Sequence, residues 1–211
     1  MASAGSKELD ELTGGYEEEI TLLYGPPASG KTTLAMIAAL KQAEEKKKVV
    51  YLDTEDGFNV VRAKQLTKGK EELLQNIIVL KIRGFKDQAR KFELLEKIIK
   101  KIKPGLIVVD TIGHYYRVAL VKDAKETNNI LAKQLRQLRL ITKEEGIPVL
   151  ITNQVYTDPK TNGIKCLGGD MVCNFSKKIL ELGVEPRFIR LIKPDKKEMK
   201  FRIDEDGIQK I

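Results

Sequence analysis

The sequence predicts an α/β fold, with a mostly parallel central sheet, helices on both faces of that sheet and antiparallel strands near its C-terminal end. Two observations carry this prediction. Short apolar runs such as "VVYLD" and "LIVVD" are rich in β-branched residues, as is typical of strands buried on both faces. Segments with helical periodicity lie between these runs, and such alternation indicates a parallel sheet.

The elements follow one another in a regular order along the first three quarters of the chain. Parallel strands are expected at residues 19–24, 48–53, 77–81, 106–110 and 148–153. Helices are expected between them, at residues 31–46, 58–67, 86–102 and 124–145. The stretches "FELLEKIIKKI" and "ILAKQLRQLRLI" show the i, i+3, i+4, i+7 spacing of apolar residues that gives a helix one buried face.

The pattern changes after residue 154. The stretch "VYTDPKTNGIKCLGGD" is rich in Gly, Pro, Asn and Asp and has no periodicity, which predicts a long loop of the kind that often carries function. Short alternating runs follow at residues 177–182, 187–193 and 199–203. Because no helical segment separates these runs, we expect them to pair as antiparallel strands.

Length and composition bound the class of protein. The 211 residues fit one domain over residues 1–211, of which we expect 1–8 to be flexible. No apolar run reaches the ~18 residues of a membrane-spanning helix, so a cytoplasmic protein with reduced cysteines is expected. The net charge of +8 favours anionic partners such as nucleic acid, although a solvated Lys-rich surface would give the same charge.

Residues 25–32 carry the most specific motif. The stretch "GPPASGKT" matches G-x-x-x-x-G-K-[ST] and lies between an apolar run and a helical one. In such a phosphate loop, backbone N–H groups and the start of the next helix surround phosphate oxygens. Lys31 is expected to reach the β- and γ-phosphates, and the Thr32 hydroxyl is expected to hold Mg²⁺. The expected nucleotide contacts are Gly25, Pro26, Pro27, Ala28, Ser29, Gly30, Lys31, Thr32 and Thr33.

Acidic side chains follow two of the predicted strands. "LIVVDT" ends its strand in Asp110, which paired with the phosphate loop is expected to hold Mg²⁺. "YLDTED" brings Asp53, Glu55 and Asp56 to the same edge of a parallel sheet, where ligands bind. We choose Glu55 over Asp53 as the carboxylate that activates a water molecule. The alternative is an acid that only caps the next helix.

Polar residues also follow the strands at 106–110 and 148–153. "LITNQV" places Asn153 and Gln154 at a strand tip, where an amide could sense the γ-phosphate or simply begin a loop. His114, the single histidine, lies four residues after Asp110. It could contact nucleotide, nucleic acid or a neighbouring chain, or it could be a loop histidine without a special role.

In this order, the four motifs resemble those of the RecA/RadA recombinase superfamily. The phosphate loop, "DTE", "VVDT" and "TNQV" all match, and "LDELTGGYEEEITLLYGPPASGKTT" is similar to the family's opening segment. The resemblance covers about residues 9 to 208 and is greatest to the short archaeal RadB paralogues. It implies a RecA-like ATPase core that works in DNA repair and recombination with ATP and Mg²⁺.

The resemblance also assigns roles to single residues. It implies that Glu55 is the catalytic carboxylate, that Lys31 acts with it on the phosphates, and that Gln154 couples the γ-phosphate to a DNA loop. Thr32 and Asp110 become the residues on the Mg²⁺ side. Arg62 matches a family arginine that lies against the adenine face, a role suited to a planar guanidinium.

The resemblance places DNA loops at residues 113–127 and 155–167. The cations that these loops offer are Arg117, Lys122, Lys125, Lys160 and Lys165. Tyr115 and Tyr116 lie in the first loop, and cations beside aromatic rings suit a single strand, although both rings could instead be partly buried.

The departures from the family pattern matter for function. Barely 15 residues of this sequence precede the core, so we expect neither an N-terminal helix-hairpin-helix domain nor a Phe-x-x-Ala polymerisation segment. The resemblance therefore implies a recombination mediator with weak ATPase activity rather than a strand-exchange enzyme. The partners it implies are single-stranded DNA, the main recombinase, a Holliday-junction resolvase, a replicative polymerase and a second copy of the chain.

Other readings of the motifs stay open. A RecA-fold regulator of protein partners, like the KaiC-like group, would need no DNA. A DNA-binding protein could hold ATP and barely hydrolyse it. A small-molecule kinase is disfavoured, because the chain has no cluster of arginines in a lid-like insertion.

Overall fold

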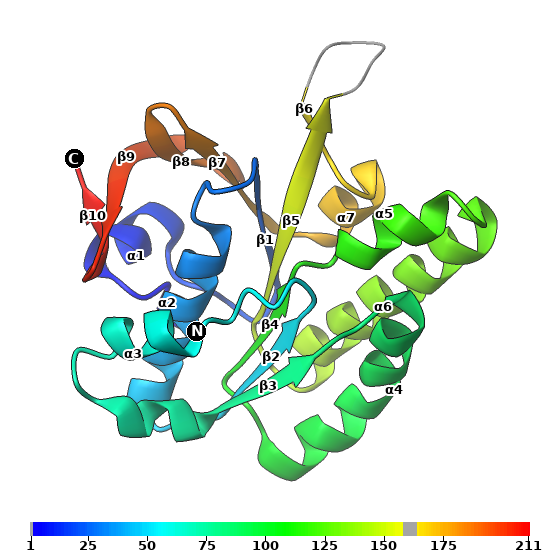
Figure 1. Ribbon diagram of the computed structural model, residues 1–211, viewed down its shortest axis with the longest axis horizontal. Helices are drawn as coiled ribbons and strands as arrows, with labels where there is room; N and C mark the ends of the chain where they lie inside the picture. The colour runs from blue at the N-terminus through cyan, green and yellow to red at the C-terminus, as the bar shows by residue number, and fades with distance from the viewer. Residues whose placement is uncertain (1, 158–163) are drawn as a thin grey trace.

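The computed structural model describes residues 2–157 and 164–211, which form a mixed α/β fold around one sheet (Figure 1). The strands lie in the order β10-β9-β8-β7-β1-β5-β4-β2-β3, and β6 pairs with β5. Their bounds are β1 (Ile20–Gly25), β2 (Val49–Asp53), β3 (Ile77–Lys81), β4 (Leu106–Asp110), β5 (Val149–Thr157), β6 (Ile164–Cys166), β7 (Lys178–Val184), β8 (Arg187–Lys193), β9 (Lys197–Asp204) and β10 (Gly207–Lys210).

The pairing of the strands confirms the predicted fold class. The neighbours β3-β2-β4-β5-β1-β7 are all parallel, and β7-β8-β9-β10 continue the sheet as antiparallel neighbours. The five expected parallel strands each lie within a few residues of the predicted bounds. The described part of the sheet therefore has a parallel half and an antiparallel half, which meet at β7.

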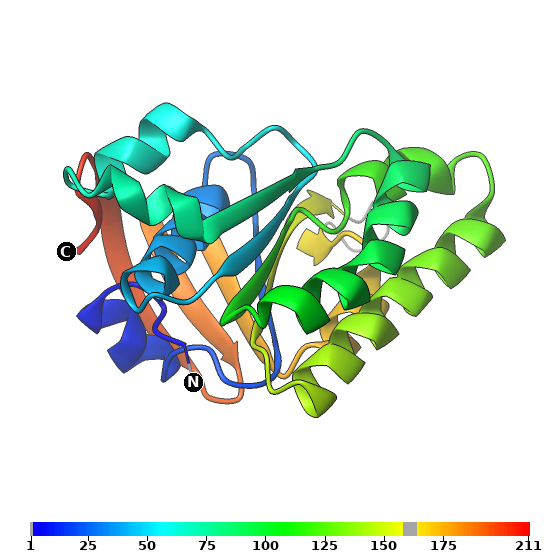
Figure 2. The same cartoon turned by 90° about the horizontal axis from the view of Figure 1, so that it is seen from below.

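Helices cover both faces of the sheet (Figures 1 and 2). The helices are α1 (Lys7–Thr13), α2 (Lys31–Glu44), α3 (Val60–Leu66), α4 (Phe85–Ile102), α5 (His114–Leu120), α6 (Ala124–Glu144) and α7 (Gly169–Phe175), with a 3₁₀ turn η1 (Glu71–Asn76). The carboxylate of Asp123 accepts a hydrogen bond from the Glu126 N–H and so begins α6, as an N-cap residue does. Asn59 caps α3 in the same way, through the Arg62 N–H.

Alternate residues of each central strand enter two separate cores. Leu23 and Val108 pack on the face of α2, while Leu22 and Val109 pack on the face of α4 and α6. All four side chains are essentially inaccessible to solvent. The strands are apolar on both sides because both faces are covered, which is why their sequences read as continuous apolar runs.

Two segments expected to be loops contain regular structure. The first DNA loop, 113–127, includes all of α5, because "YYRVAL" packs Tyr116 into the core of α4 and α6. In the second, 155–167, β5 runs on to Thr157 and pairs with β6 as an antiparallel ribbon. That ribbon was not evident from the sequence, because turn-forming residues interrupt its short strands.

The N-terminal segment packs against the body of the protein. Residues 1–8 were expected to be flexible, yet Ala2 and Ala4 are buried. The carboxylate of Asp10 holds this segment, since it accepts hydrogen bonds from the Ser3 hydroxyl at 2.6 Å and from the Ala4 N–H at 2.6 Å. No helix in the described ranges is both long enough and apolar enough to span a bilayer.

Candidate functional site

The register of the sheet brings the predicted motifs to one edge. Asp53 at the end of β2 is the partner of Asp110 at the end of β4. Gly25 at the end of β1 is the partner of Gln154 in β5. Because these strands are parallel, their carboxyl ends lie together beside the start of α2, which begins at Lys31.

The phosphate loop connects β1 to α2. Ala28 and Gly30 have positive φ angles of 60° and 103°, so the loop curls tightly before the helix begins. The Lys31 ammonium lies inside this curl and donates hydrogen bonds to the carbonyls of Gly25 at 3.0 Å and Pro26 at 2.8 Å. Burial lowers the pKa of Lys31, and the nearby carboxylates of Asp110 and Glu55 oppose that shift.

Asp110 is the most enclosed carboxylate of the site. The Tyr51 hydroxyl donates to its Oδ2 at 2.6 Å, the Thr152 hydroxyl donates to its Oδ1, and the Thr32 hydroxyl also bonds to it. Burial raises the pKa of Asp110 above the usual range, and these three hydrogen bonds pull it back. The bond from Thr32 places the two predicted Mg²⁺ residues in direct contact.

Glu55 lies at the centre of a small polar cluster. Its Oε1 accepts hydrogen bonds from Gln154 Nε2 and from the Thr111 hydroxyl, both at 2.8 Å. His114 Nδ1 lies 3.5 Å from the same oxygen. The predicted carboxylate, the predicted amide and the single histidine are therefore side by side, although they come from three different strand ends.

Asp53 has a different position from Glu55. It is buried, and its carboxylate accepts three backbone hydrogen bonds, from the N–H groups of Glu55, Gly57 and Phe58 at 3.0–3.2 Å. These bonds shape the turn that follows β2. Asp53 does not line the cavity at the phosphate loop, whereas Glu55 does, and Asp56 pairs with Lys81 at 2.7 Å.

Arg62 lies on α3 and contacts the C-terminal hairpin. Its guanidinium donates to the carbonyl of Asp204 at 2.5 Å and to that of Glu205 at 3.2 Å. Ile203, one residue before these carbonyls, lies beside Gly30 and lines the cavity at the phosphate loop. The turn between β9 and β10 therefore bridges Arg62 and the phosphate loop.

The cavity at the phosphate loop has the chemistry of a nucleotide site. It has a volume of about 280 Å³, and the residues that line it are Pro27, Ala28, Gly30, Lys31, Thr32, Thr33, Glu55, Thr111, Gln154 and Ile203. The Ser29 hydroxyl is buried in the loop without a hydrogen-bond partner among the described residues. A cation, hydroxyls and the start of a helix of 14 residues are the groups that fit a phosphate chain.

The same groups fit Mg²⁺. Among the described residues, no cluster of three or more His, Cys, Asp or Glu side chains could hold a metal ion by itself. Mg²⁺ at a phosphate site needs no such cluster, because one or two protein oxygens, phosphate oxygens and water complete its shell. Thr32 and Asp110 supply oxygens of that kind.

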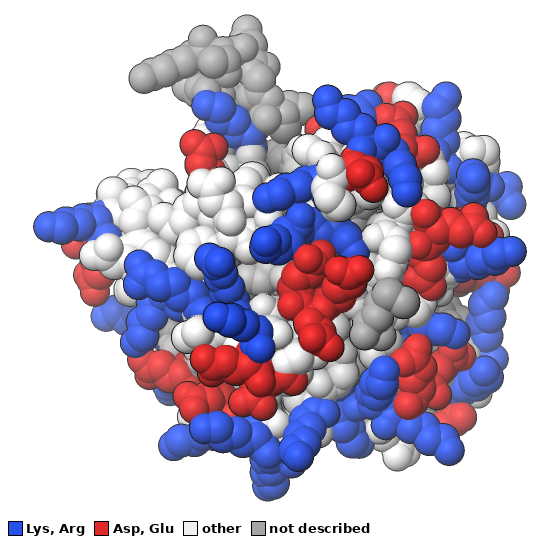
Figure 3. Space-filling model, turned by 180° about the vertical axis from the view of Figure 1, so that it is seen from behind, with Lys and Arg blue, Asp and Glu red and all other residues white. Residues whose placement is uncertain are grey.

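The predicted DNA contacts fall into separate groups. Arg117 lies on α5 and Lys125 on α6, with Lys122 between the two helices, and all three are exposed. Lys165 is exposed on β6, and Lys160 lies outside the described residues. On the face shown in Figure 3, blue and red side chains are interspersed, so this face carries no single-sign field.

The two tyrosines beside these cations are tied into the fold. Tyr116 is 6% exposed, and its hydroxyl donates to Asn128 Oδ1 at 2.8 Å. The Tyr115 hydroxyl donates to the carbonyl of Ile82 at 3.2 Å. Neither ring is free to stack on a base, which agrees with the alternative expectation that both tyrosines are partly buried.

Four residues of the site were missed in the sequence. Tyr51 and Thr152 hold Asp110, Thr111 holds Glu55, and Ile203 lines the cavity. Thr111 and Thr152 are neighbours in sequence of predicted site residues. They could have been found because each apolar strand becomes polar at its carboxyl end. Tyr51 looks like a core residue in sequence, and Ile203 lies far along the chain.

Comparison with known proteins agrees with this geometry. The family model described as Rad51 matches residues 1–211. A relative from Methanococcus maripaludis, named DNA repair and recombination protein RadB, is 36% identical over 214 residues, covering 95% of this chain and 96% of the relative.

Two further relatives carry the same name. The protein from Thermococcus sibiricus is 35% identical and covers 100% of this chain and 96% of its own length. The protein from Methanococcoides burtonii is 33% identical, with 96% and 95% covered. The similarity therefore extends through all the elements that build the site.

Proposed function

This chain belongs to the Rad51 family, and on that premise we propose that it is a recombinase paralogue that binds ATP and single-stranded DNA and hydrolyses ATP slowly. Its relatives are named as DNA repair and recombination proteins, which supports a role in the same processes. We also propose that residues 1–211 act as one ATPase domain in the cytoplasm.

One observation carries the ATPase proposal. Lys31, the Thr32–Asp110 pair and the Glu55–Gln154 pair all meet at the carboxyl edge of one sheet. Phosphoryl transfer depends on positioning and on charge stabilisation more than on covalent chemistry by the protein. A cation, a metal-side acid and a second carboxylate at one cavity are the parts that it requires.

Each residue then has a distinct part in the reaction. The ammonium of Lys31 neutralises charge on the β- and γ-phosphates, and the N–H groups of residues 25–33 hold the phosphate chain. When bound, Mg²⁺ supplies further charge neutralisation at the phosphate oxygens, held by Thr32 and Asp110. Glu55 accepts the proton of the attacking water. The guanidinium of Arg62, already fixed by two carbonyls, provides a flat surface for the adenine.

The Gln154–Glu55 hydrogen bond supports a link between the nucleotide and DNA. Gln154 lies in β5, whose end pairs with β6 in the second predicted DNA loop. A change in the hydrogen bonds of Gln154 would act directly on the ribbon that carries Lys165 and leads to Lys160. We propose that Arg117, Lys122 and Lys125 contribute to the same DNA surface through phosphate contacts.

Phosphate release from ATP, measured with and without single-stranded DNA, tests the proposal. We expect slow turnover that requires Mg²⁺, increases with DNA and disappears in Lys31→Ala. Binding of labelled oligothymidylate should weaken steeply as salt rises, since each phosphate contact releases counterions. ATP turnover without DNA binding, even at low salt, would instead support a regulator of protein partners, and the absence of ATP binding would refute the ATPase assignment.

A further inference from the structure

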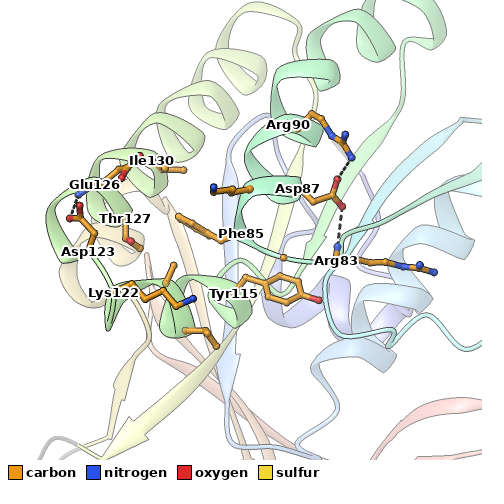
Figure 4. Close-up of a pocket in the computed structure, with 14 residues that line it drawn as sticks. Arg83, Phe85, Asp87, Arg90, Tyr115, Lys122, Asp123, Glu126, Thr127 and Ile130 are labelled. Atoms are coloured by element: carbon orange, nitrogen blue, oxygen red, sulfur yellow. Dashed lines mark hydrogen bonds and ion pairs between the residues drawn. The ribbon is translucent and has the colours of Figure 1, made fainter.

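A groove of about 740 Å³ lies away from the nucleotide cavity, between the start of α4, α5 and the start of α6 (Figure 4). No residue that lines this groove also lines the cavity at the phosphate loop. The groove belongs to no part of the proposed ATPase machinery, and its size is typical of a ligand-binding cleft.

The floor of the groove is apolar. Phe85, Val118, Ala119 and Ile130 contribute side chains from three helices. Val118 is 58% exposed, and Val121, which follows α5 and lies beside the groove lining rather than in it, is 89% exposed. A large apolar side chain at such exposure, beside an apolar groove floor, indicates a surface that a partner covers.

The rim of the groove carries an excess of available positive charge. The carboxylate of Asp87 is already occupied, because it accepts the Arg83 N–H at 3.0 Å and pairs with Arg90 at 2.6 Å. The side chains of Arg83, Lys86 and Lys122 have no hydrogen bond or ion pair to any described residue.

Two acids on the opposite rim have no ion pair to a described residue. Asp123 accepts the backbone N–H of Glu126 as the cap of α6, a bond that leaves its negative charge in place, and Glu126 is the second acid. Figure 4 shows Asp123 and Glu126 gathered at the α6 end, while Arg83 lies at the opposite end and Lys122 between them. Three cations without an ion pair against two carboxylates without one leave the rim with a net positive charge, which favours an anionic occupant.

The details of the groove favour a peptide over a nucleic acid strand. Base stacking needs open aromatic faces, yet Phe85 packs edge-on against Tyr116 and Tyr115 packs edge-on against His114. The most exposed apolar side chain of the floor is aliphatic, as a pocket for another apolar side chain would be. A phosphate backbone would also have to pass the carboxylate of Glu126.

We propose that this groove is a docking site for a short acidic segment of a partner protein, with one large apolar side chain seated on Phe85 and Val118. The acidic residues of the segment pair with Arg83 and Lys86 on the α4 rim. The apolar anchor gives the affinity, and the charges give orientation and a faster encounter. The groove and the nucleotide cavity are separate sites, because they share no lining residue.

A random library of short displayed peptides, selected on the full chain, tests the proposal. We expect the enriched peptides to combine one Phe, Leu or Trp with several Asp or Glu residues. The strongest of them, labelled with fluorescein, should lose affinity about tenfold or more with Val118→Asp, measured by anisotropy. Val61→Asp is the matched control, because Val61 is 68% exposed on α3 and lies outside the groove.

A second variant keeps the test decisive if Val118→Asp does not fold. Lys86→Glu reverses an exposed charge of the rim and should weaken the peptide about tenfold, with a smaller dependence on salt. Lys97→Glu, a reversal elsewhere on α4, should leave binding unchanged. Turnover of ATP without DNA should be unchanged in Val118→Asp and Lys86→Glu.

Three results would overturn the proposal. The library could enrich no acidic peptide with an apolar anchor. The enriched peptides could bind Val118→Asp and Lys86→Glu as tightly as the native chain. Labelled oligothymidylate could compete with the peptide and lose affinity in Val118→Asp, which would make the groove a nucleic-acid surface. None of these results depends on the ATPase activity, so the ATPase assignment and the docking site fail separately. Lys122 lines the groove and is also a proposed DNA contact, which is why the competition with oligothymidylate is measured.

Discussion

Replacing Glu55 by Gln is the most direct test of the catalytic cluster. Oε1 of Glu55 accepts from Gln154 Nε2 and the Thr111 hydroxyl, both at 2.8 Å. The amide oxygen of a glutamine can accept both bonds in the same place. The substitution therefore removes the negative charge and the basic oxygen while it leaves the shape and the hydrogen bonds of the cluster nearly unchanged.

The size of the effect follows from the role of the residue. A positioned general base contributes about 10²–10⁴ to a rate. Since each factor of ten corresponds to about 1.4 kcal/mol, the barrier should rise by roughly 3–5 kcal/mol in Glu55→Gln. ATP affinity should stay within about twofold, because the hydrogen bonds from Gln154 and Thr111 remain and Lys31 is untouched.

Two assays separate these expectations. Single-turnover phosphate release measures the chemical step, and binding of a fluorescent ATP analogue measures affinity. Asp56→Asn is the matched control, because Asp56 is the next acid along the chain but pairs with Lys81 outside the cavity. Turnover in Glu55→Gln that equals that of Asp56→Asn would refute the catalytic assignment.

Three further predictions follow from the same geometry. Lys31→Ala should lose detectable ATP binding by calorimetry, since its ammonium is the cation of the phosphate loop; unchanged affinity would contradict this. Thr152→Val removes a hydrogen bond that lowers the pKa of Asp110, so that pKa rises and the acid limb of the Mg²⁺-dependent turnover should move to higher pH, whereas Thr152→Ser should not move it. A hydrogen bond from the Cys166 thiol lowers the pKa of Cys173 to about 7, so the rate of alkylation of Cys173 by iodoacetamide should be half-maximal near pH 7. Mass spectrometry should find the buried Cys166 unmodified. A rate that is half-maximal only above pH 8 would refute the assignment.

The parallel half of the fold could be predicted because its signals are local. Residues 106–109 are all apolar, and both faces of β4 are indeed buried. The motifs at 25–32 and 51–56 follow strands, and parallel pairing then brings strand ends to one edge without further information. The edge that holds the site therefore follows from the sequence.

The parts that could not be predicted depend on contacts between distant residues. The choice of Glu55 rather than Asp53 as the catalytic carboxylate rests on three hydrogen bonds that the Asp53 carboxylate accepts from backbone N–H groups. No rule of sequence spacing reveals these bonds. Arg62 is fixed by carbonyls about 140 positions along the chain, a distance that local patterns do not cross. The helix α5 was hidden inside an expected loop, because its short length gives too little periodicity to detect.

The hairpin of β9 and β10 connects the proposed nucleotide site to the edge of the sheet. Its turn carries the carbonyls that fix Arg62, and Ile203 beside it faces the phosphate loop. Nucleotide binding would therefore be coupled to the pairing of β10 with β9. The free energy by which a bound nucleotide stabilises this pairing equals the binding free energy that is lost when the pairing opens. Amide protons of the last two strands should then exchange more slowly as ATP is added, even though none of them belongs to the phosphate loop itself.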